Sequence, residues 1–325
     1  MSPGSPGTRP WRAARSFAAF SAVLAASAAC SSGAAAFPAI SGEVGEVPSV
    51  DFSEAPGFDG VERLVVTEGT GDEVTGNDLV VSHQAVYEWR SDGTAQEAYS
   101  SYGGDPLFLP LPSLSDTVPE AVEALDDAAV GARLALAYPP SHPPVAQERE
   151  IEREDGGAST LVVYDVLDRY PAGEVVDQED EEMRFDGDGE LPDVHVVQGR
   201  RPQITVPRDS APDEPTTTVL IEGDGEPAEA GASVVTQYRG VTWEEGTEFD
   251  STWEYGATPA HFTLDRASVI EGWRQGLEGV RAGSRVLLTV PPDLAYGSEG
   301  NSAVDVAPDR TLVYVIDVLD VIPPS

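Results

Sequence analysis

The residue types that most often perform covalent or metal chemistry are sparse in this sequence. The 325 residues include four histidines (His83, His142, His195 and His261) and one cysteine, Cys30. The histidines do not have the spacing of metal ligands, and the cysteine has no CxxC partner. No Ser/His/Asp or Cys/His set lies within a recognisable motif. We therefore expect no metal and no cofactor, and a hydrolase has little support.

Aromatic and apolar residues carry more information, above all in the stretch from Val269 to Gly297. Its first part places apolar residues at helical spacing, with Trp273 at the centre of the apolar face. Val286–Val290 then has the composition of a buried β-branched strand, which Pro291 ends because proline cannot donate to a ladder. The stretch predicts a short helix, a strand and an aromatic loop that ends at Tyr296 and Gly297.

The elements around this stretch must position its aromatic side chains. Several short apolar runs separated by glycines and prolines predict strands, with one helix after the middle. This pattern predicts an α+β fold in which an antiparallel twisted sheet wraps around one short helix. The expected elements are strands at 234–238, 247–251, 261–264, 286–290 and 312–318 and a helix near 270–280.

Four motifs occur in order within about residues 216–322: VVTQYRG at 234–240, GTEFDS at 246–251, VIEGW at 269–273 and LAYG at 294–297. Each motif alone is common. Together, and at these distances, they resemble an FKBP-type peptidyl-prolyl cis-trans isomerase domain. The resemblance implies a catalytic domain at residues 216–325.

The chemistry implied by this resemblance requires neither a nucleophile nor a proton transfer. Rotation of a prolyl peptide bond is opposed by amide resonance, which sets a barrier of about 18–20 kcal/mol. An apolar pocket favours the twisted amide, which has lost charge separation and depends less on water. By resemblance, Trp273 forms the floor of this pocket. The residues that would line its walls are Tyr238, Phe249, Val269, Ile270 and Tyr314.

Two polar groups are implied to orient the substrate. Tyr296 would donate a hydrogen bond from its hydroxyl to the substrate carbonyl next to the rotating bond. Asp250 would face the rotating carbonyl and be held by neighbours such as Tyr238. The residues taken singly also fit a plainer interpretation, in which Trp273, Phe249 and Tyr238 are core residues and Asp250 is an exposed turn acid.

The sequence departs from the family pattern at several positions around the pocket. Tyr255 lies in the loop where the family commonly has an arginine, and Ala260 replaces a wall phenylalanine. Asn301 lies near a usual histidine. Val304 and Val306 are the best matches to an Ile-Ile pair that contacts substrate. The shape and preference of the pocket are therefore open at this point.

The chain contains an internal duplication. Phe37-Pro38 matches Leu191-Pro192, and Trp89 matches Trp243, both at an offset of 154 residues. In this alignment Gln84 lies opposite Tyr238, Ala121 replaces Trp273, and the A-Y-G segment is missing. We expect residues 61–172 to form a degenerate domain that retains the fold without catalysis, as a client-binding or spacer module.

The N-terminus has the pattern of a secretory signal. Three arginines precede an apolar run at residues 17–29, which ends at Cys30. This resembles a bacterial lipoprotein signal, in which the cysteine is lipidated, although Ser27 stands where that pattern prefers leucine. Cleavage at an Ala-x-Ala site or an incidental thiol are the alternatives. We expect residues 1–36 to be a signal peptide and the protein to be secreted and lipid-anchored on the outer face of the membrane.

The formal net charge of −38 argues against nucleic acids and anionic lipid surfaces as partners. Acidic residues concentrate between the two copies, which predicts an extended linker and lead segment at 173–215. Residues 37–60 are expected to be an extended lead segment of the first copy.

Two functions from different classes follow from these observations. The first is a prolyl isomerase that assists folding outside the cytoplasm, with proline-containing polypeptides as clients and the family's macrolides as possible inhibitors. The alternative is a non-catalytic peptide-binding or chaperone lipoprotein. The intact Trp273, Asp250 and Tyr296 favour the first.

Overall fold

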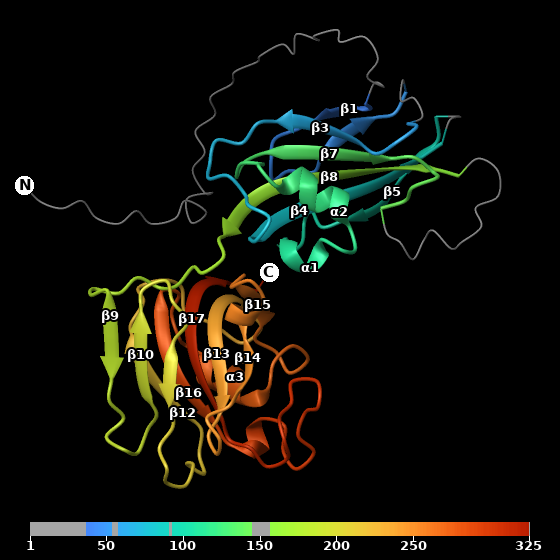
Figure 1. Cartoon of the computed structure of the whole chain (residues 1–325). Helices are drawn as coiled ribbons and strands as arrows, with labels where there is room; N and C mark the ends of the chain where they lie inside the picture. The colour runs from blue at the N-terminus through green and yellow to red at the C-terminus, as the bar shows by residue number, and fades with distance from the viewer. Residues whose placement is uncertain (1–36, 54–57, 91–92, 145–156, 325) are drawn as a thin grey trace, which may run out of the picture. The chain divides into compact units, whose positions relative to one another are not determined.

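A computed structural model of the chain describes residues 37–53, 58–90, 93–144 and 157–324. These residues belong to two compact units (Figure 1). Of the described residues, the first unit comprises 37–53, 58–73, 81–90, 93–107, 127–144 and 157–168, and the second 74–80, 108–126 and 169–324. The expected signal peptide and Cys30 lie outside the described residues. Within the described ranges, no helix is long and apolar enough to cross a membrane.

Within the second unit, residues 216–324 form a six-stranded antiparallel sheet with one short helix, α3, which confirms the predicted fold class. The strand order is β12-β16-β17-β13-β14, and β15 also pairs with β13. Two 3₁₀ turns follow β14 and β16. The elements are β12 (Thr216–Ile221), β13 (Ser233–Thr242), β14 (Glu248–Ser251), η3 (Thr252–Glu254), β15 (Ala260–Thr263), α3 (Glu271–Leu277), β16 (Ser284–Val290), η4 (Pro292–Leu294) and β17 (Leu312–Ile322).

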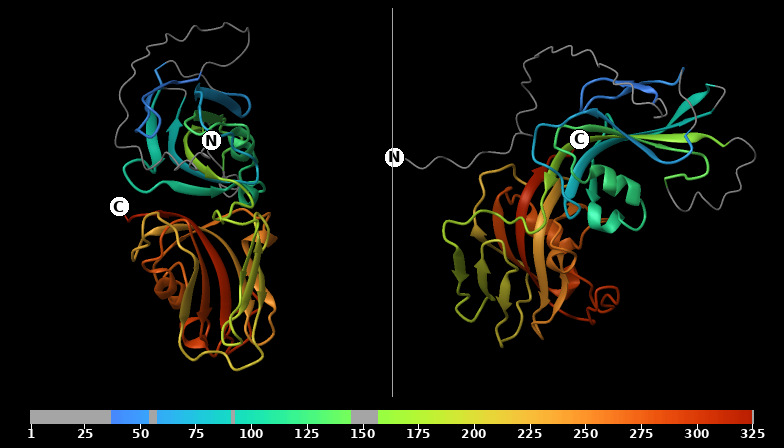
Figure 2. Two further views of the ribbon diagram at one scale, coloured as in Figure 1. Left: turned by 90° about the vertical axis from the view of Figure 1, so that its left-hand side faces the viewer. Right: turned by 45° about the horizontal axis from the view of Figure 1, so that its top comes forward.

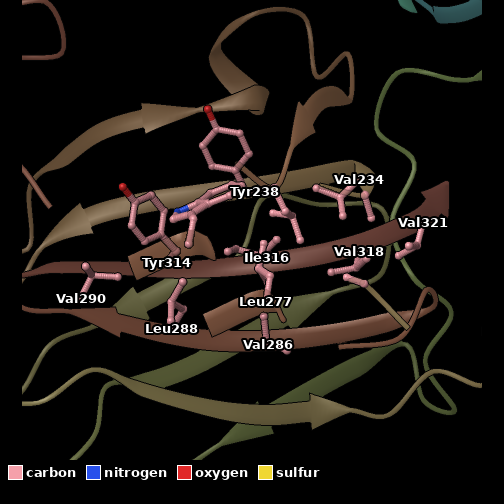
Figure 3. Close-up of a cluster of buried hydrophobic side chains, with 14 of the residues drawn as sticks. Val234, Tyr238, Leu277, Val286, Leu288, Val290, Tyr314, Ile316, Val318 and Val321 are labelled. Atoms are coloured by element: carbon pink, nitrogen blue, oxygen red, sulfur yellow. The ribbon is translucent and has the colours of Figure 1, made fainter. Parts of the chain in front are cut away.

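Two glycines of helix α3 face the sheet and allow the helix to pack closely against it. A Cβ atom on Gly272 would lie 2.2 Å from Cγ1 of Val290, and one on Gly276 would lie 2.3 Å from Cδ1 of Leu288. The apolar side of the helix is buried with the inner face of the sheet, where Trp273 is 4% exposed. Figure 3 shows Tyr314 toward the end of this core where Val290 lies, Val321 at the other end, and Tyr238 between them.

The outer face of the same sheet is covered by a smaller sheet, and here our prediction of an extended linker at 173–215 was wrong. The strands β9 (Glu182–Phe185), β10 (Asp193–Val197) and β11 (Gln203–Thr205) form a three-stranded sheet in the order β11-β10-β9. Val194 and Val196 are buried in one cluster with Trp243. Figure 2 shows these strands and α3 on opposite faces of the sheet. The segment is acidic overall, so its composition indicated a linker. Its apolar residues nevertheless alternate along the chain, and this pattern is enough to bury one side of a strand.

A buried ion pair joins the preceding segment to the sheet. Nε of Arg285 lies 2.5 Å from Oδ1 of Asp317, and the guanidinium group also donates to the side chain of Gln178 at 2.7 Å. The backbone N–H of Val176 donates to Asp317. Arg285 is fully buried. Because a buried charge is costly unless it is paired and hydrogen-bonded, residues 176–178 are part of this unit's structure.

The first copy of the duplication has a sheet of the same strand order, β3-β7-β8-β4-β5, with β6 pairing to β4. Two short helices, α1 and α2, come between β6 and β7 in the sequence. The elements are β3 (Glu62–Thr67), β4 (Leu79–Trp89), β5 (Ala95–Ser100), β6 (Leu107–Pro110), α1 (Leu111–Leu114), α2 (Pro119–Leu125), β7 (Arg133–Tyr138) and β8 (Ser159–Tyr170).

The lead segment of the first copy is also more structured than we expected. Strands β1 (Ala39–Ser41) and β2 (Ser49–Asp51) pair as a hairpin, with Ala39 opposite Asp51. In the second copy Asp193 pairs with Thr205, at the same offset of 154. Ile40 and Val50 pack against a core that contains Trp89. The repeated unit therefore includes the small sheet as well as the large one.

Candidate active site

The second unit contains a pocket with a volume of about 780 Å³ on the side of the sheet that carries α3. Trp273 lies in the first turn and a half of α3, and its apolar ring contributes to the lining. The pocket is lined by Tyr238, Asp250, Phe262, Arg266, Ala267, Ser268, Val269, Ile270, Glu271, Trp273, Gln275, Leu294, Tyr296 and Tyr314.

Three aromatic rings surround Trp273 and meet it at steep angles. The ring centroids of Tyr238, Phe262 and Tyr314 lie 5.1, 5.2 and 5.3 Å from that of Trp273, at interplanar angles of 85°, 73° and 85°. Edge-to-face contacts of this kind add to the stabilisation from area burial. The floor of the pocket is therefore a rigid aromatic cluster, suited to hold an apolar ring.

One wall of the pocket carries a carboxylate held by a tyrosine. The hydroxyl of Tyr238 donates to Oδ2 of Asp250 at 2.7 Å. Strands β13 and β14 bring the two together, since Asp250 pairs with Gly240 across the ladder. Burial, and then the charge of Asp250, raise the pKa of Tyr238 far above its usual value, so the hydroxyl keeps its proton. Tyr238 is therefore a permanent donor that fixes the carboxylate at the pocket wall.

The hydroxyl of Thr252 fixes the backbone of Tyr238. Oγ1 of Thr252 accepts the Tyr238 N–H at 3.0 Å and donates to the Tyr238 carbonyl at 3.1 Å. Thr252 is 4% exposed. The side chain thus replaces the strand partner that Tyr238 lacks where β14 ends.

Replacing Thr252 with valine should therefore lower the free energy of unfolding of this unit by about 1–3 kcal/mol. The change keeps the shape of the side chain but leaves a buried backbone N–H unpaired. Denaturant unfolding of the Thr252→Val protein measures the effect, with the exposed Thr247→Val change as the control. Equal stability of the two variants would contradict this role for Thr252.

Tyr296 reaches the pocket from the loop after η4. The loop is closed by the Gly297 N–H, which donates to the Pro292 carbonyl, and by the Gly300 N–H, which donates to the Tyr296 carbonyl. Partial burial is the main cause that raises the pKa of Tyr296 above its ordinary value. The phenol stays protonated at neutral pH and can donate a hydrogen bond to a ligand in the pocket.

Most of the residues expected at the site lie together, and some do not. Val269 and Ile270 line the pocket with the tyrosines, Trp273 and Asp250. Phe249 lies behind Tyr314, with ring centroids 5.5 Å apart. Val304 and Val306 pack against the core rather than lining the pocket, and Val306 is 4% exposed. The family pattern alone could not distinguish these two locations.

Sequence reasoning missed several lining residues, of which Phe262 contacts the pocket floor. We noted Ala260 as the loss of a wall phenylalanine, yet Phe262 on the same strand lines the pocket and contacts Trp273. Residues two apart on a strand share a face, so the alternation along β15 was the available signal.

The corresponding positions of the first copy of the duplication carry no such aromatic cluster. Ala121 is the third residue of α2, as Trp273 is the third residue of α3. Leu136 pairs with Val162 in the register in which Leu288 pairs with Tyr314. Gln84 takes the place of Tyr238. The first copy therefore has no aromatic residue at the positions that form the floor and two walls of the pocket in the second copy. As for metals, no three potential ligands gather within the described residues.

The comparisons with known proteins agree with this geometry. A model of the FKBP-type peptidyl-prolyl cis-trans isomerase family matches residues 224–319. An FK506-binding protein of Streptomyces anulatus is 39% identical over 121 residues, which cover 37% of this chain and 97% of that protein. A probable FK506-binding protein of Corynebacterium glutamicum is 40% identical over 119 residues, 37% of this chain and 97% of the relative. The chain belongs to the FKBP-type peptidyl-prolyl cis-trans isomerase family.

The similarity extends to a larger bacterial protein. The FKBP-type peptidyl-prolyl cis-trans isomerase FkpA of Escherichia coli K12 is 39% identical over 105 residues, 32% of this chain and 37% of that protein. A crystal structure of FkpA from the same species matches with a TM-score of 0.32 and 36% identity, over 34% of this chain and 49% of the other. The three sequence relatives each match about a third of this chain.

Proposed function

We propose that the second unit isomerises X–Pro bonds of polypeptide clients by a non-covalent mechanism in the pocket floored by Trp273. The observation that carries this proposal is the convergence of three features in one cavity: the aromatic floor, the Tyr238–Asp250 pair and the half-buried hydroxyl of Tyr296. Uncatalysed isomerisation takes tens of seconds or more, which makes it slow enough to limit folding.

Each group has a distinct part in the proposed reaction. The apolar floor receives the proline ring and excludes water, which favours the twisted amide over the planar one. Tyr296 donates to the carbonyl next to the rotating bond. Asp250, held by Tyr238, faces the rotating carbonyl. No proton is exchanged, because both tyrosines act as fixed donors.

The pH dependence tests this mechanism. We expect kcat/KM for a prolyl peptide to stay constant within about twofold between pH 6 and 9. The pKa values of Tyr238 and Tyr296 are both raised by burial, so neither side chain loses its proton in this range. NMR exchange spectroscopy of a proline-containing peptide measures the rate without a coupled protease. A bell-shaped profile in this interval would point to general acid–base catalysis and contradict the mechanism.

For the first copy, residues 61–172, we propose a role without turnover, as a spacer or a surface that holds clients. The absence of aromatic residues at the three compared pocket positions supports this role. The alternative for the whole chain, a peptide-binding protein without catalysis, predicts the same peptide binding and no acceleration of exchange. The rate measurement therefore separates the two.

We further propose that the protein acts outside the cytoplasm and is anchored through Cys30. The support is the sequence pattern of residues 1–30 alone. A Cys30→Ala protein expressed in a bacterial host should leave the membrane fraction and appear in the medium, while a Ser31→Ala control should stay. Retention of both proteins in the membrane fraction would contradict the lipid anchor.

A further inference from the structure

An exposed arginine side chain lies at the mouth of the pocket. Arg266 lines the pocket, and its side chain is 82% exposed. The loop that carries it is fixed by Asp265, whose Oδ1 accepts the backbone N–H groups of Ala267 at 2.9 Å and Ser268 at 2.8 Å. The guanidinium group is thus presented to solvent from a short turn with defined backbone hydrogen bonds.

Arg266 forms a long ion pair with Glu271 but no hydrogen bond to it. Glu271 lies with its Oε2 3.5 Å from Nε of Arg266, beyond a normal hydrogen bond. Its oxygens are instead taken by Arg274, at 2.5 and 3.0 Å, and by Gln275 at 2.8 Å. These bonds also lower the pKa of Glu271 to about 2, so the arrangement persists at neutral pH. The planar fork of Arg266 keeps donors for another acceptor.

The surrounding charge makes this cation unusual. Residues 171–325 contain 31 aspartates and glutamates against 10 arginines, a formal charge of −21. A field of this sign disfavours acidic ligands at a distance. A guanidinium group at the rim opposes the field only at short range, where its two parallel donors match a carboxylate.

We propose that Arg266 is a specificity-determining residue, which pairs with an acidic side chain that flanks the proline of a bound polypeptide. This inference rests on the proposed function of the pocket. The substrate class it names is prolyl peptides with Asp or Glu within two residues of the proline, in preference to the same peptides with Asn, Gln or Lys.

A cycle of charge changes on the full chain and on the peptide tests this assignment. Peptides carry Glu, Gln or Lys at one position, which is the first or second residue before or after the proline. We expect wild-type kcat/KM to be about two- to fivefold higher for Glu than for Gln at one of these positions, the range of an exposed ion pair. Arg266→Glu should reverse the order, with Lys above Gln above Glu. Comparing the two proteins removes the part of the long-range field that they share, and the charge-reversal control below accounts for the change in net charge.

Arg281→Glu is the matched control. Arg281 is an exposed arginine of the same unit that does not line the pocket, and its reversal changes the net charge equally. We expect this variant to leave the Glu-to-Gln ratio unchanged. The assignment is overturned if Arg266→Glu and Arg281→Glu alter the ratio equally, or if neither alters it at any position.

A measurement of peptide binding distinguishes the failure of this inference from the failure of the proposed isomerase function. Peptide affinity can be measured by NMR titration of the same proteins, without turnover. If the wild-type chain binds the peptide but does not accelerate cis-trans exchange, the proposed isomerase function is contradicted. The Kd values of the Glu, Gln and Lys peptides for the wild type and Arg266→Glu then still test the role of Arg266.

Discussion

A Trp273→Ala protein should isomerise prolyl peptides with a kcat/KM about 100-fold lower than the wild type. Trp273 is 4% exposed and contacts Tyr238, Phe262 and Tyr314, so its removal deletes the surface on which the proline ring would rest. Replacing a buried tryptophan with alanine costs about 3–5 kcal/mol of stability, and about 3 kcal/mol of lost transition-state binding corresponds to the expected factor. The rate of cis-to-trans isomerisation of a prolyl tetrapeptide, measured with each protein, tests this loss.

Two further variants keep this prediction decisive. Trp273→Phe retains an aromatic floor and should lose about tenfold, with a native-like NMR spectrum. Trp89→Ala removes a tryptophan that is 2% exposed, but in the first unit, and should leave the rate unchanged. A folded Trp273→Ala protein with the wild-type rate would show that the pocket floor does not contribute to catalysis.

The second large effect concerns the small sheet. A fragment of residues 216–325, which contains every motif of the family, should fail to fold, whereas a fragment of residues 171–325 should fold. Without β9–β11 the outer face of the large sheet would be uncovered. Burial of one apolar side chain contributes about 1.5–3 kcal/mol, so five of them approach the whole stability of a domain. The side chains that would be uncovered are Val241, Trp243, Leu287, Val313 and Val315.

The shorter fragment would also lose the partners of the buried ion pair, Val176 and Gln178. Circular dichroism and denaturant unfolding of the two fragments measure the difference. In the full chain, Val196→Asp should destabilise the second unit strongly, because Val196 is fully buried. Gln203→Asp, on the exposed side of β11, is its control. Similar unfolding midpoints for the two fragments would contradict a structural role for β9–β11.

Much of the large sheet could be predicted from the sequence, because its strands are regular and its motifs are local. The expected strand at 234–238 lies within β13, which runs from Ser233 to Thr242. The extra length has a tertiary cause, since β13 pairs with β14, β15 and β17 along different parts of its length. The helix was placed correctly because Trp273 and Leu277 are four residues apart on one face.

The small sheets were missed because their strands are short and one of them is embedded in acidic sequence. The duplication contained the missing information. The match between Phe37-Pro38 and Leu191-Pro192 lies outside both expected domains, and the hairpins β1–β2 and β10–β11 begin directly after it. A repeated segment that adjoins a domain is itself evidence of structure.

The ion pairs in the core could not be predicted from local patterns. Arg133 and Asp165 are 32 residues apart, as are Arg285 and Asp317, and sequence alone gives no reason to bury a charge. The pocket lining has a similar limit. The sequence motifs located Trp273, Asp250 and Tyr296, whereas the contribution of Arg266 depends on how the chain turns after β15.

The central claim is that this protein turns prolyl bonds, and the most direct measurement is the rate at which a cis-prolyl tetrapeptide relaxes to trans as the full chain is added. We predict an observed rate constant that rises linearly with protein concentration, at protein far below the peptide concentration. A rate that stays at the uncatalysed value at every concentration, in a sample that binds the peptide by NMR, would contradict the account and leave a peptide-binding protein.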